Sequence, residues 1–195
     1  PLGLDDSVAL SLCGPAVPAD TCLAGWEFSV PANTPGGDLD GFEISYQQPF
    51  TFLPAPFNGF GAIINYTSVD SKVKYLDQNG VVVANTDLTG LSQSAYNATL
   101  YFENERFSAR VSAAYRDEYL TTVPGRNGND VEGTAETLNI DAAASFSLND
   151  NIEFTLEAIN LTDEFQDQWV DDNGDRLSFY HHTGREYFLG ARFRF

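Results

Sequence analysis

The feature that most constrains this chain is the alternation of residue types at its end. Between residues 185 and 195 every second residue is apolar or amphipathic, and those between are mostly polar or small. A period of two is that of an extended strand with two unlike faces. Such a strand suits either the boundary between lipid and water or the edge of a soluble β-sandwich. The apolar set is Tyr187, Leu189, Ala191, Phe193 and Phe195.

The same alternation recurs from Gly41 onward, so we expect an all-β, antiparallel fold in residues 41–195. Together with the last strand, the chain should hold about seven strands. Residues 1–40 are rich in proline and are predicted to form a long loop, with a turn at 36–38 and a short strand at 26–30. The other predicted strands are 42–46, 60–67, 96–102, 107–115, 138–148 and 152–158.

The connections between these strands alternate in length. Those at 53–58, 103–106 and 149–151 are short, whereas those at 68–93, 121–136 and 160–184 are long. The first long connection has a small hairpin signal at Asn79-Gly80. Transmembrane β-barrels place short turns on the periplasmic side and long loops outside, whereas a soluble sandwich has no reason for this pattern.

Aromatic residues gather at the strand ends, as membrane-interface girdles require. The other strand face carries Glu, Arg, Asp and Asn at mid-strand, which suits a wet lumen. An odd, partial set of strands cannot close a barrel, and open edges do not occur in lipid, so we expect further strands upstream. The expected girdles are Phe50, Phe57, Phe107, Phe154 and Phe195 at one end and Tyr66, Tyr96, Tyr115 and Tyr119 at the other.

Composition excludes several classes of protein. The chain has 195 residues and a net charge of −18, which argues against nucleic-acid binding. Hydrophobic residues are 43%, far from the composition of disordered chains. No run of ~18 apolar residues exists, so a transmembrane helix is not expected, but a transmembrane strand needs only ~9–11 residues. Methionine is absent and no signal segment opens the chain, which favours a fragment or processed product.

Cys13 and Cys22 lie close together among glycine and proline residues. We expect a short-range disulfide formed in an oxidising compartment, the alternative being two reduced thiols. The spacing is not that of a zinc site.

Several segments, in order, resemble TonB-dependent outer-membrane receptors. The resemblance covers about residues 35–195, and residues 1–34 correspond only to a variable loop. The residues that carry it are Asn33 with Gly41-Phe42-Glu43, Asn65-Tyr66-Thr67 with Asp70-Ser71, Tyr101-Phe102-Glu103 with Phe107-Ser108-Ala109-Arg110-Val111, Tyr115-Arg116-Asp117-Glu118-Tyr119, Asn160-Leu161-Thr162-Asp163, and Gly184-Arg185-Glu186-Tyr187 running to the terminal Phe195.

The resemblance implies an integral outer-membrane transporter of a Gram-negative bacterium. Its barrel of ~22 strands would surround a plug domain, which this fragment lacks. The TonB–ExbB–ExbD complex would supply energy through that plug, and the barrel-assembly machinery would read the terminal strand, residues 187–195. The closest resemblance is to receptors of the Xanthomonas and Caulobacter type, which favours an oligosaccharide ligand, with a siderophore or other metal chelate next.

Four residues are candidates for ligand contact. Arg110 and Arg116 are expected on the lumen face together with Asp141, and the alternative for them is ion pairing with the plug or with each other. Trp169 and Tyr180, with Phe179 beside the latter, lie in the last long loop, where aromatic faces stack on sugars or aromatic ligands. The alternative for these aromatic residues is packing against neighbouring loops.

Metal sites and catalysis are not expected. His181 and His182 are adjacent, so their side chains should point to opposite faces of a strand and not share one ion. The acidic segment 171–175 is oxygen-rich, but it lacks EF-hand spacing and is more simply a turn. No Ser/His/Asp set, phosphate-binding loop or glycine-rich cofactor loop is present, so we expect neither an enzyme nor a cofactor.

Two alternatives to active transport stay open. One is a soluble, secreted β-sandwich that binds a ligand, and the other is a passive porin that lacks a plug. A plug-like domain of ~130–150 residues with a TonB box upstream would decide for the transporter, on the family resemblance.

Overall fold

The computed structural model describes residues 35–77, 80–171, 174 and 176–195, which belong to the unit Thr34–Phe195. The predicted strand at 26–30 and the predicted Cys13–Cys22 disulfide lie outside the described residues. No helix in these described ranges is long and apolar enough to cross a membrane.

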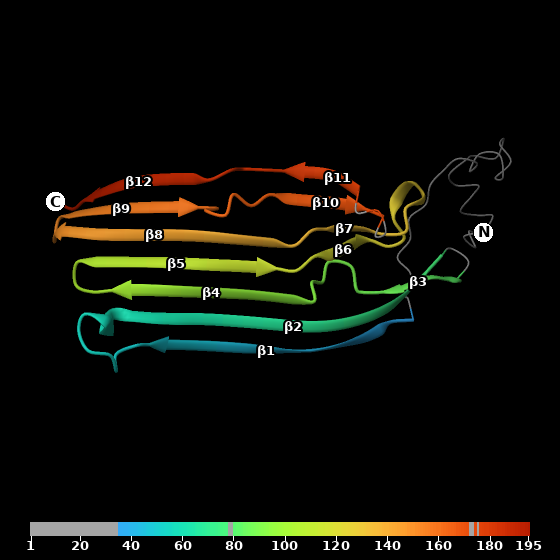
Figure 1. The fold of residues 1–195 in the computed structure, drawn as a ribbon, viewed down its shortest axis with the longest axis horizontal. Helices are drawn as coiled ribbons and strands as arrows, with labels where there is room; N and C mark the ends of the chain where they lie inside the picture. Colours follow the sequence, from blue (N-terminus) through green and yellow to red (C-terminus); the bar gives the residue numbers. More distant parts are fainter. Residues whose placement is uncertain (1–34, 78–79, 172–173, 175) are drawn as a thin grey trace, which may run out of the picture. The chain divides into compact units, whose positions relative to one another are not determined.

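Seven strands form the main sheet, and every neighbouring pair is antiparallel (Figure 1). An eighth strand, β3 (Val82–Thr86), pairs with the end of β2, and the predicted hairpin at Asn79-Gly80 falls in part outside the described residues. The predicted all-β antiparallel fold and seven main strands are therefore confirmed. In order across the sheet the strands are β1 (Gly37–Pro49), β2 (Phe60–Leu76), β4 (Ser94–Glu103), β5 (Phe107–Arg116), β8 (Thr137–Asn149), β9 (Ile152–Ile159) and β12 (Glu186–Phe193).

Both ends of this series differ slightly from the prediction. The predicted turn at 36–38 is wrong, because Gly37 and Asp38 pair with β2 and begin the first strand. The last strand ends at Phe193 instead of Phe195, since β9, its partner, begins at Ile152. Only the backbone N–H of Arg194 continues the ladder, donating to the Asn151 carbonyl at 2.9 Å.

The register gives the main sheet two unlike faces. On the apolar face Leu156 lies opposite Leu189 on one side and Ala144 on the other, and Leu100 lies opposite Val111. Apart from Ala144, which is half-buried, these side chains are exposed; Leu189, for example, is 83% exposed. Among the hydrophobic residues that the structure describes, only Trp169 is buried, so no hydrophobic core covers this face.

The opposite face carries polar side chains that bond across the strands. The Ser45 hydroxyl donates to Asn65 at 2.7 Å. The hydroxyls of Thr99 and Ser112 lie 2.9 Å apart. Since paired residues share a face, these bonds show that one polar surface runs across the sheet.

Aromatic rows mark both ends of the apolar face. Tyr66, Tyr96 and Tyr115 lie opposite one another in register, and the rings of Tyr96 and Tyr115 stack at 5.0 Å. At the other end Phe107 pairs with Phe146, which pairs with Phe154. Phe60, Phe102 and Phe146 also lie at the phenylalanine end, whereas Tyr119, predicted for the tyrosine row, lies beyond the main sheet in β6.

The short turns are closed by asparagine side chains. Asn104 Oδ1 accepts the backbone N–H groups of Arg106 and Phe107, at 3.0 and 2.8 Å. Asn149 Oδ1 likewise accepts the N–H of Asn151 at 2.9 Å. Side-chain oxygens thus satisfy the turn backbone without a longer loop.

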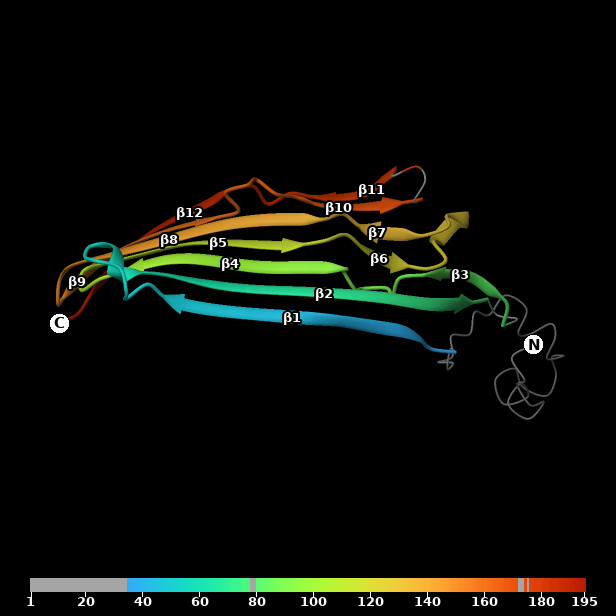
Figure 2. The same ribbon diagram turned by 60° about the horizontal axis from the view of Figure 1, so that its bottom comes forward.

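Two of the long connections contain a second, four-stranded sheet that the sequence did not predict. Its order, β11-β10-β7-β6, repeats the order of the four main strands from which its members continue (Figure 2). β6 follows β5, β7 precedes β8, β10 follows β9, and β11 precedes β12. The strands are β6 (Tyr119–Thr122), β7 (Glu132–Thr134), β10 (Gln166–Val170) and β11 (Arg176–His181), and the short helices are η1 (Phe57–Gly59) and η2 (Arg126–Gly128).

The two sheets are separated by a line of interrupted residues, here called the break row. It consists of residues 117–118, 135–136, 160–165 and 182–185. Along the break row the regular hydrogen-bond ladder stops, and side chains take over backbone groups that neighbouring strands would otherwise satisfy.

Candidate ligand-binding hollow on the polar face

A hollow of about 370 Å³ opens at the break row. Thr137 and Asn139 of the main sheet line one side of it. Both belong to the polar face, because Asn139 pairs with Ala114, which pairs with Asn97. The second sheet supplies further side chains, so the hollow lies where one sheet passes into the other. These further residues are Tyr119, Thr134, Gln166 and His181.

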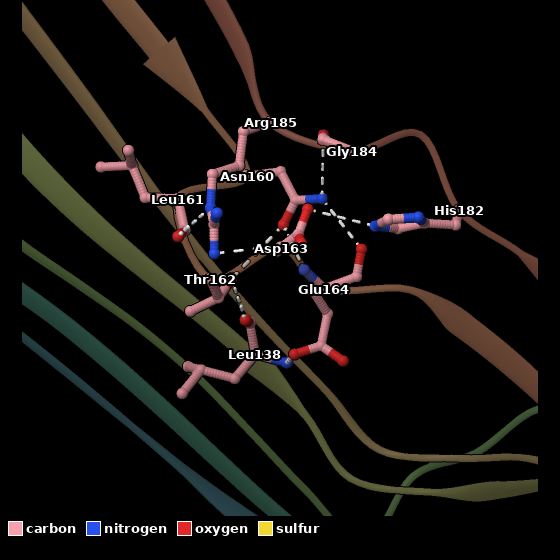
Figure 3. Close-up of polar contacts among 9 residues, drawn as sticks. All are labelled: Leu138, Asn160, Leu161, Thr162, Asp163, Glu164, His182, Gly184 and Arg185. Carbon is pink, nitrogen blue, oxygen red and sulfur yellow. Dashed lines mark hydrogen bonds and ion pairs between the residues drawn. The ribbon is translucent and has the colours of Figure 1, made fainter.

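Asn160 lines this hollow and closes the turn after β9 through its polar contacts (Figure 3). Its backbone is left-handed, with φ at 56°, and the residue is only 5% exposed. Its Nδ2 donates to the Glu164 carbonyl at 2.8 Å and the Gly184 carbonyl at 3.2 Å. Its Oδ1 accepts the Glu164 N–H at 2.7 Å. The buried side-chain amide of Asn160 therefore links the turn after β9 to Gly184, two residues before β12 begins.

The same turn is bound to β8. The Asn160 N–H donates to Asp141 Oδ1 at 2.8 Å, and Thr162 Oγ1 donates to the Leu138 carbonyl at 2.7 Å. Leu138 N–H donates to Glu164 Oε2 at 3.1 Å. Asp141, a lumen-face candidate in the sequence, thus supports the turn. The Asn160-Leu161-Thr162-Asp163 segment fixes three strands at the edge of the hollow.

The side chains of the two adjacent histidines have different surroundings. His181 lines the hollow, whereas His182 Nε2 lies 3.1 Å from Asp163 Oδ1. Asp163 also lies 3.9 Å from Arg185 Nη2. Within the described part of the chain, no group of three or more His, Cys, Asp or Glu side chains is placed to hold a metal.

Arg116 reaches the hollow but is held by the protein. Its Nε donates to Ser92 Oγ and its Nη2 to the Gly90 carbonyl, both at 2.8 Å. The guanidinium carbon lies 3.9 Å from the centre of the Tyr119 ring. Its contacts therefore fasten the connection before β4 to the break row.

Arg110 lies on the same face of β5, six residues nearer the short turns, or roughly 20 Å along the strand. It lines a second hollow of about 510 Å³ with Tyr101 and Glu157. The structure therefore places both predicted arginines on one face but in separate hollows.

The two predicted aromatic candidates, Trp169 and Tyr180, differ in burial. Trp169 is 7% exposed and packs on Gly133, where any side chain would overlap the indole. In this structure the Trp169 indole packs against Gly133, which corresponds to the loop-packing alternative given for the aromatic residues. Tyr180 is 52% exposed, and its ring lies 5.5 Å from that of Phe165. Tyr180 does not line the hollow, because it is adjacent to His181 in β11 and its ring lies 6.1 Å from that of His182.

An ion pair fixes the β6–β7 connection above the hollow. Glu132 is 4% exposed and accepts Arg126 Nη2 at 2.6 Å and Nε at 2.9 Å. These bonds from the Arg126 side chain hold the pKa of Glu132 below its usual value. The acidic segment 171–175 is described only in part: Asp171 accepts a bond from Arg176 at 2.8 Å.

Sequence reasoning missed several hollow residues. Thr137 and Asn139 were visible as the polar positions of a predicted strand. Gln166 and Thr183 carried no signal, because they lie in a long connection whose residues show no regular period.

Comparison with known proteins supports the fold. No protein-family model and no curated protein matches the sequence. The structure is similar to that of the siderophore receptor PiuA from Acinetobacter baumannii, with a TM-score of 0.58 and 17% sequence identity. The match covers 80% of this chain but only 22% of that receptor. The described residues therefore have the fold of part of an antiparallel β-barrel wall.

Proposed function

We propose that this chain forms the C-terminal part of the barrel wall of an outer-membrane transporter of the TonB-dependent type. The observation that carries the proposal is a single sheet with one exposed apolar face, one hydrogen-bonded polar face, and loop lengths that differ between its ends. These are the properties that lipid on one side and a watery lumen on the other require.

The height of the apolar face supports a membrane span. Tyr115 and Phe107, which mark the two aromatic rows on β5, are eight residues apart, or about 27 Å along the strand. A tilt of about 40° reduces this to about 21 Å, close to the ~25 Å apolar band of such barrels.

The soluble-sandwich alternative loses support. A sandwich needs a second sheet packed about 10 Å above the apolar face. The second sheet here continues the main sheet instead of covering it (Figure 2). The passive porin remains as an alternative, because it would share this wall.

The orientation follows from the loop lengths. The short turns face the periplasm and the second sheet faces the outside, so the hollow at the break row lies at the outer mouth of the lumen. In this proposal the partners are outer-membrane lipid, the barrel-assembly machinery, the TonB–ExbB–ExbD complex acting through a plug outside these residues, and the ligand. The chain binds and conducts, and it catalyses nothing.

The hollow favours a neutral, hydroxyl-rich ligand such as an oligosaccharide. The charged side chains of Arg116 and Glu164 already bond to other parts of the protein. Arg116 donates to Ser92 and Gly90, and Glu164 accepts the Leu138 N–H. The remaining lining is mostly hydroxyl, amide and aromatic, which pairs well with sugar hydroxyls and ring faces. A siderophore is the second candidate, favoured by the similarity to PiuA.

Uptake of labelled oligosaccharides and ferric siderophores by cells with and without the full-length protein tests this proposal. Asn139→Leu should raise the half-saturating oligosaccharide concentration by about tenfold, the effect of losing one buried polar contact. Asn97→Leu, in the same row but outside the hollow, should not. Uptake that survives a protonophore would favour the porin, and equal effects of both variants would remove the hollow from the binding path.

A further inference from the structure

Three buried side-chain atoms in the second sheet have no hydrogen-bond partner among the described residues. They are Thr134 Oγ1, Asp167 Oδ1 and Trp169 Nε1. Buried polar groups in proteins are nearly always hydrogen-bonded, because leaving one unpaired costs stability. Each of these atoms therefore needs an explanation, and the position of Thr134 supplies one.

Thr134 lies in the middle of the second sheet, on the face that carries the hollow. The residue is 2% exposed and is among those that line the hollow. In β7 it pairs with Tyr119 on one side and with Gln168 on the other. Paired residues share a face of the sheet. Tyr119 lines the hollow, and so does Gln166, two residues from Gln168.

The other two unpaired atoms do not border the hollow. Trp169 pairs with Gly133, the residue before Thr134, so its indole lies on the opposite face of the second sheet. Asp167 follows Gln166 in β10 and does not line the hollow. Of the three atoms, only Thr134 Oγ1 belongs to a residue that a ligand in the hollow would contact.

The chemistry of this hydroxyl restricts what can pair with it. A threonine hydroxyl donates one hydrogen bond and also accepts, and a hydroxyl group of a ligand can do the same. Because Thr134 is almost fully enclosed, only a small polar group can reach it. A sugar hydroxyl is small enough, whereas the bulk of a metal chelate is not.

We propose that Thr134 Oγ1 hydrogen-bonds a hydroxyl group of a neutral oligosaccharide and helps to determine specificity for it. This rests on the proposed function, because the hollow is the ligand site suggested there. The unpaired hydroxyl then destabilises the free protein and contributes to affinity once the ligand is bound. Stability and affinity should therefore respond in opposite ways when the hydroxyl is removed.

Thr134→Val tests this, because it replaces the hydroxyl by a methyl group of similar size. Binding of cellotetraose, maltotetraose and xylotetraose to the full-length protein in detergent is measured by calorimetry, and stability by denaturant titration. The variant should bind the tightest of these sugars about tenfold more weakly, the effect of losing one hydrogen bond. It should unfold at the same or a higher denaturant concentration. Thr134→Ser, which keeps the hydroxyl, should retain the affinity.

Thr99→Val is the matched control. The Thr99 hydroxyl lies on the polar face of the main sheet, 2.9 Å from that of Ser112, and Thr99 does not line the hollow. Removing this paired hydroxyl should lower the denaturant midpoint and leave the affinity unchanged. The pattern is the reverse of that expected for Thr134→Val.

The results that overturn the inference are distinct from those that refute the barrel. A lower denaturant midpoint for Thr134→Val would show that the hydroxyl has a partner within the protein. An unchanged affinity would show that the sugar does not contact it. Either result, or the failure of all three sugars to bind the wild-type protein, overturns the inference while the barrel wall stands. The barrel wall is refuted if the full-length protein does not float with lipid vesicles after reconstitution.

Discussion

At the scale of single residues, Asn160 combines strain with burial. Replacing it by alanine keeps the left-handed backbone, which costs an ordinary residue about 1–2 kcal/mol, and leaves the Glu164 N–H and Gly184 carbonyl without their partner. We expect Asn160→Ala to reduce the free energy of unfolding by about 2–4 kcal/mol, measured by denaturant titration in detergent. Asn160→Gly should cost less, because glycine removes only the hydrogen bonds. Equal costs would show that strain has no part.

Leu156 and Glu157 are neighbours with opposite environments. Leu156 is 51% exposed on the apolar face, and Glu157 lines the Arg110 hollow. Leu156→Arg should destabilise the full-length protein by about 2–4 kcal/mol, whereas Glu157→Arg should cost little. Leu156→Phe should be nearly neutral in fluid lipid, but it would cost about 1–3 kcal/mol in a packed core. A costly Leu156→Phe with a tolerated Leu156→Arg would rule out a lipid-facing site.

The Glu132–Arg126 pair predicts a pH dependence. Since the pKa of Glu132 is lowered in the fold, its stabilisation is present above the unfolded pKa and is lost as pH falls through the folded value. Hydrogen exchange in residues 126–134, corrected for intrinsic rates, should therefore rise as the pH falls below the ordinary pKa of glutamate, about 4.3. Glu132→Gln should exchange fast already at about pH 6. An unchanged pH profile in this variant would exclude Glu132 as the cause.

At the scale of elements, the sequence predicts strands wherever their two faces meet different surroundings. The main strands were recognisable because residues such as Leu156 and Glu157 alternate through them. The second sheet was not, because its strands are short, and β6 and β10 contain register shifts that interrupt the period. The hollow escaped prediction for the same reason: it forms where Gln166 and His181 of the second sheet meet Asn139 of the main sheet.

The side of the membrane that each connection faces can be tested directly. We expect a cysteine at Asn127, in η2, to react with an impermeant maleimide on whole cells, because η2 belongs to the long connections. A cysteine at Asp150, in a short turn, should react only after the outer membrane is permeabilised. The reverse pattern would invert the orientation.

At the scale of the whole molecule, the account depends on what the two faces of the sheet contact. The described sheet has two open borders, β1 and β12, and an apolar face without a covering layer. Both are costly in water, and both are resolved if the sheet is one part of a closed wall in lipid. The structural similarity to PiuA supports the β-barrel fold alone.

The most direct measurement is spin-label accessibility along β9 in the full-length protein in bilayers. Labels at residues 153–158 are exposed in turn to oxygen, which concentrates in lipid, and to a water-soluble nickel chelate. The account expects oxygen to dominate at Phe154, Leu156 and Ala158 and the chelate at Glu153, Thr155 and Glu157. Equal access of the chelate to both sets, or no access of oxygen to Leu156, would contradict it.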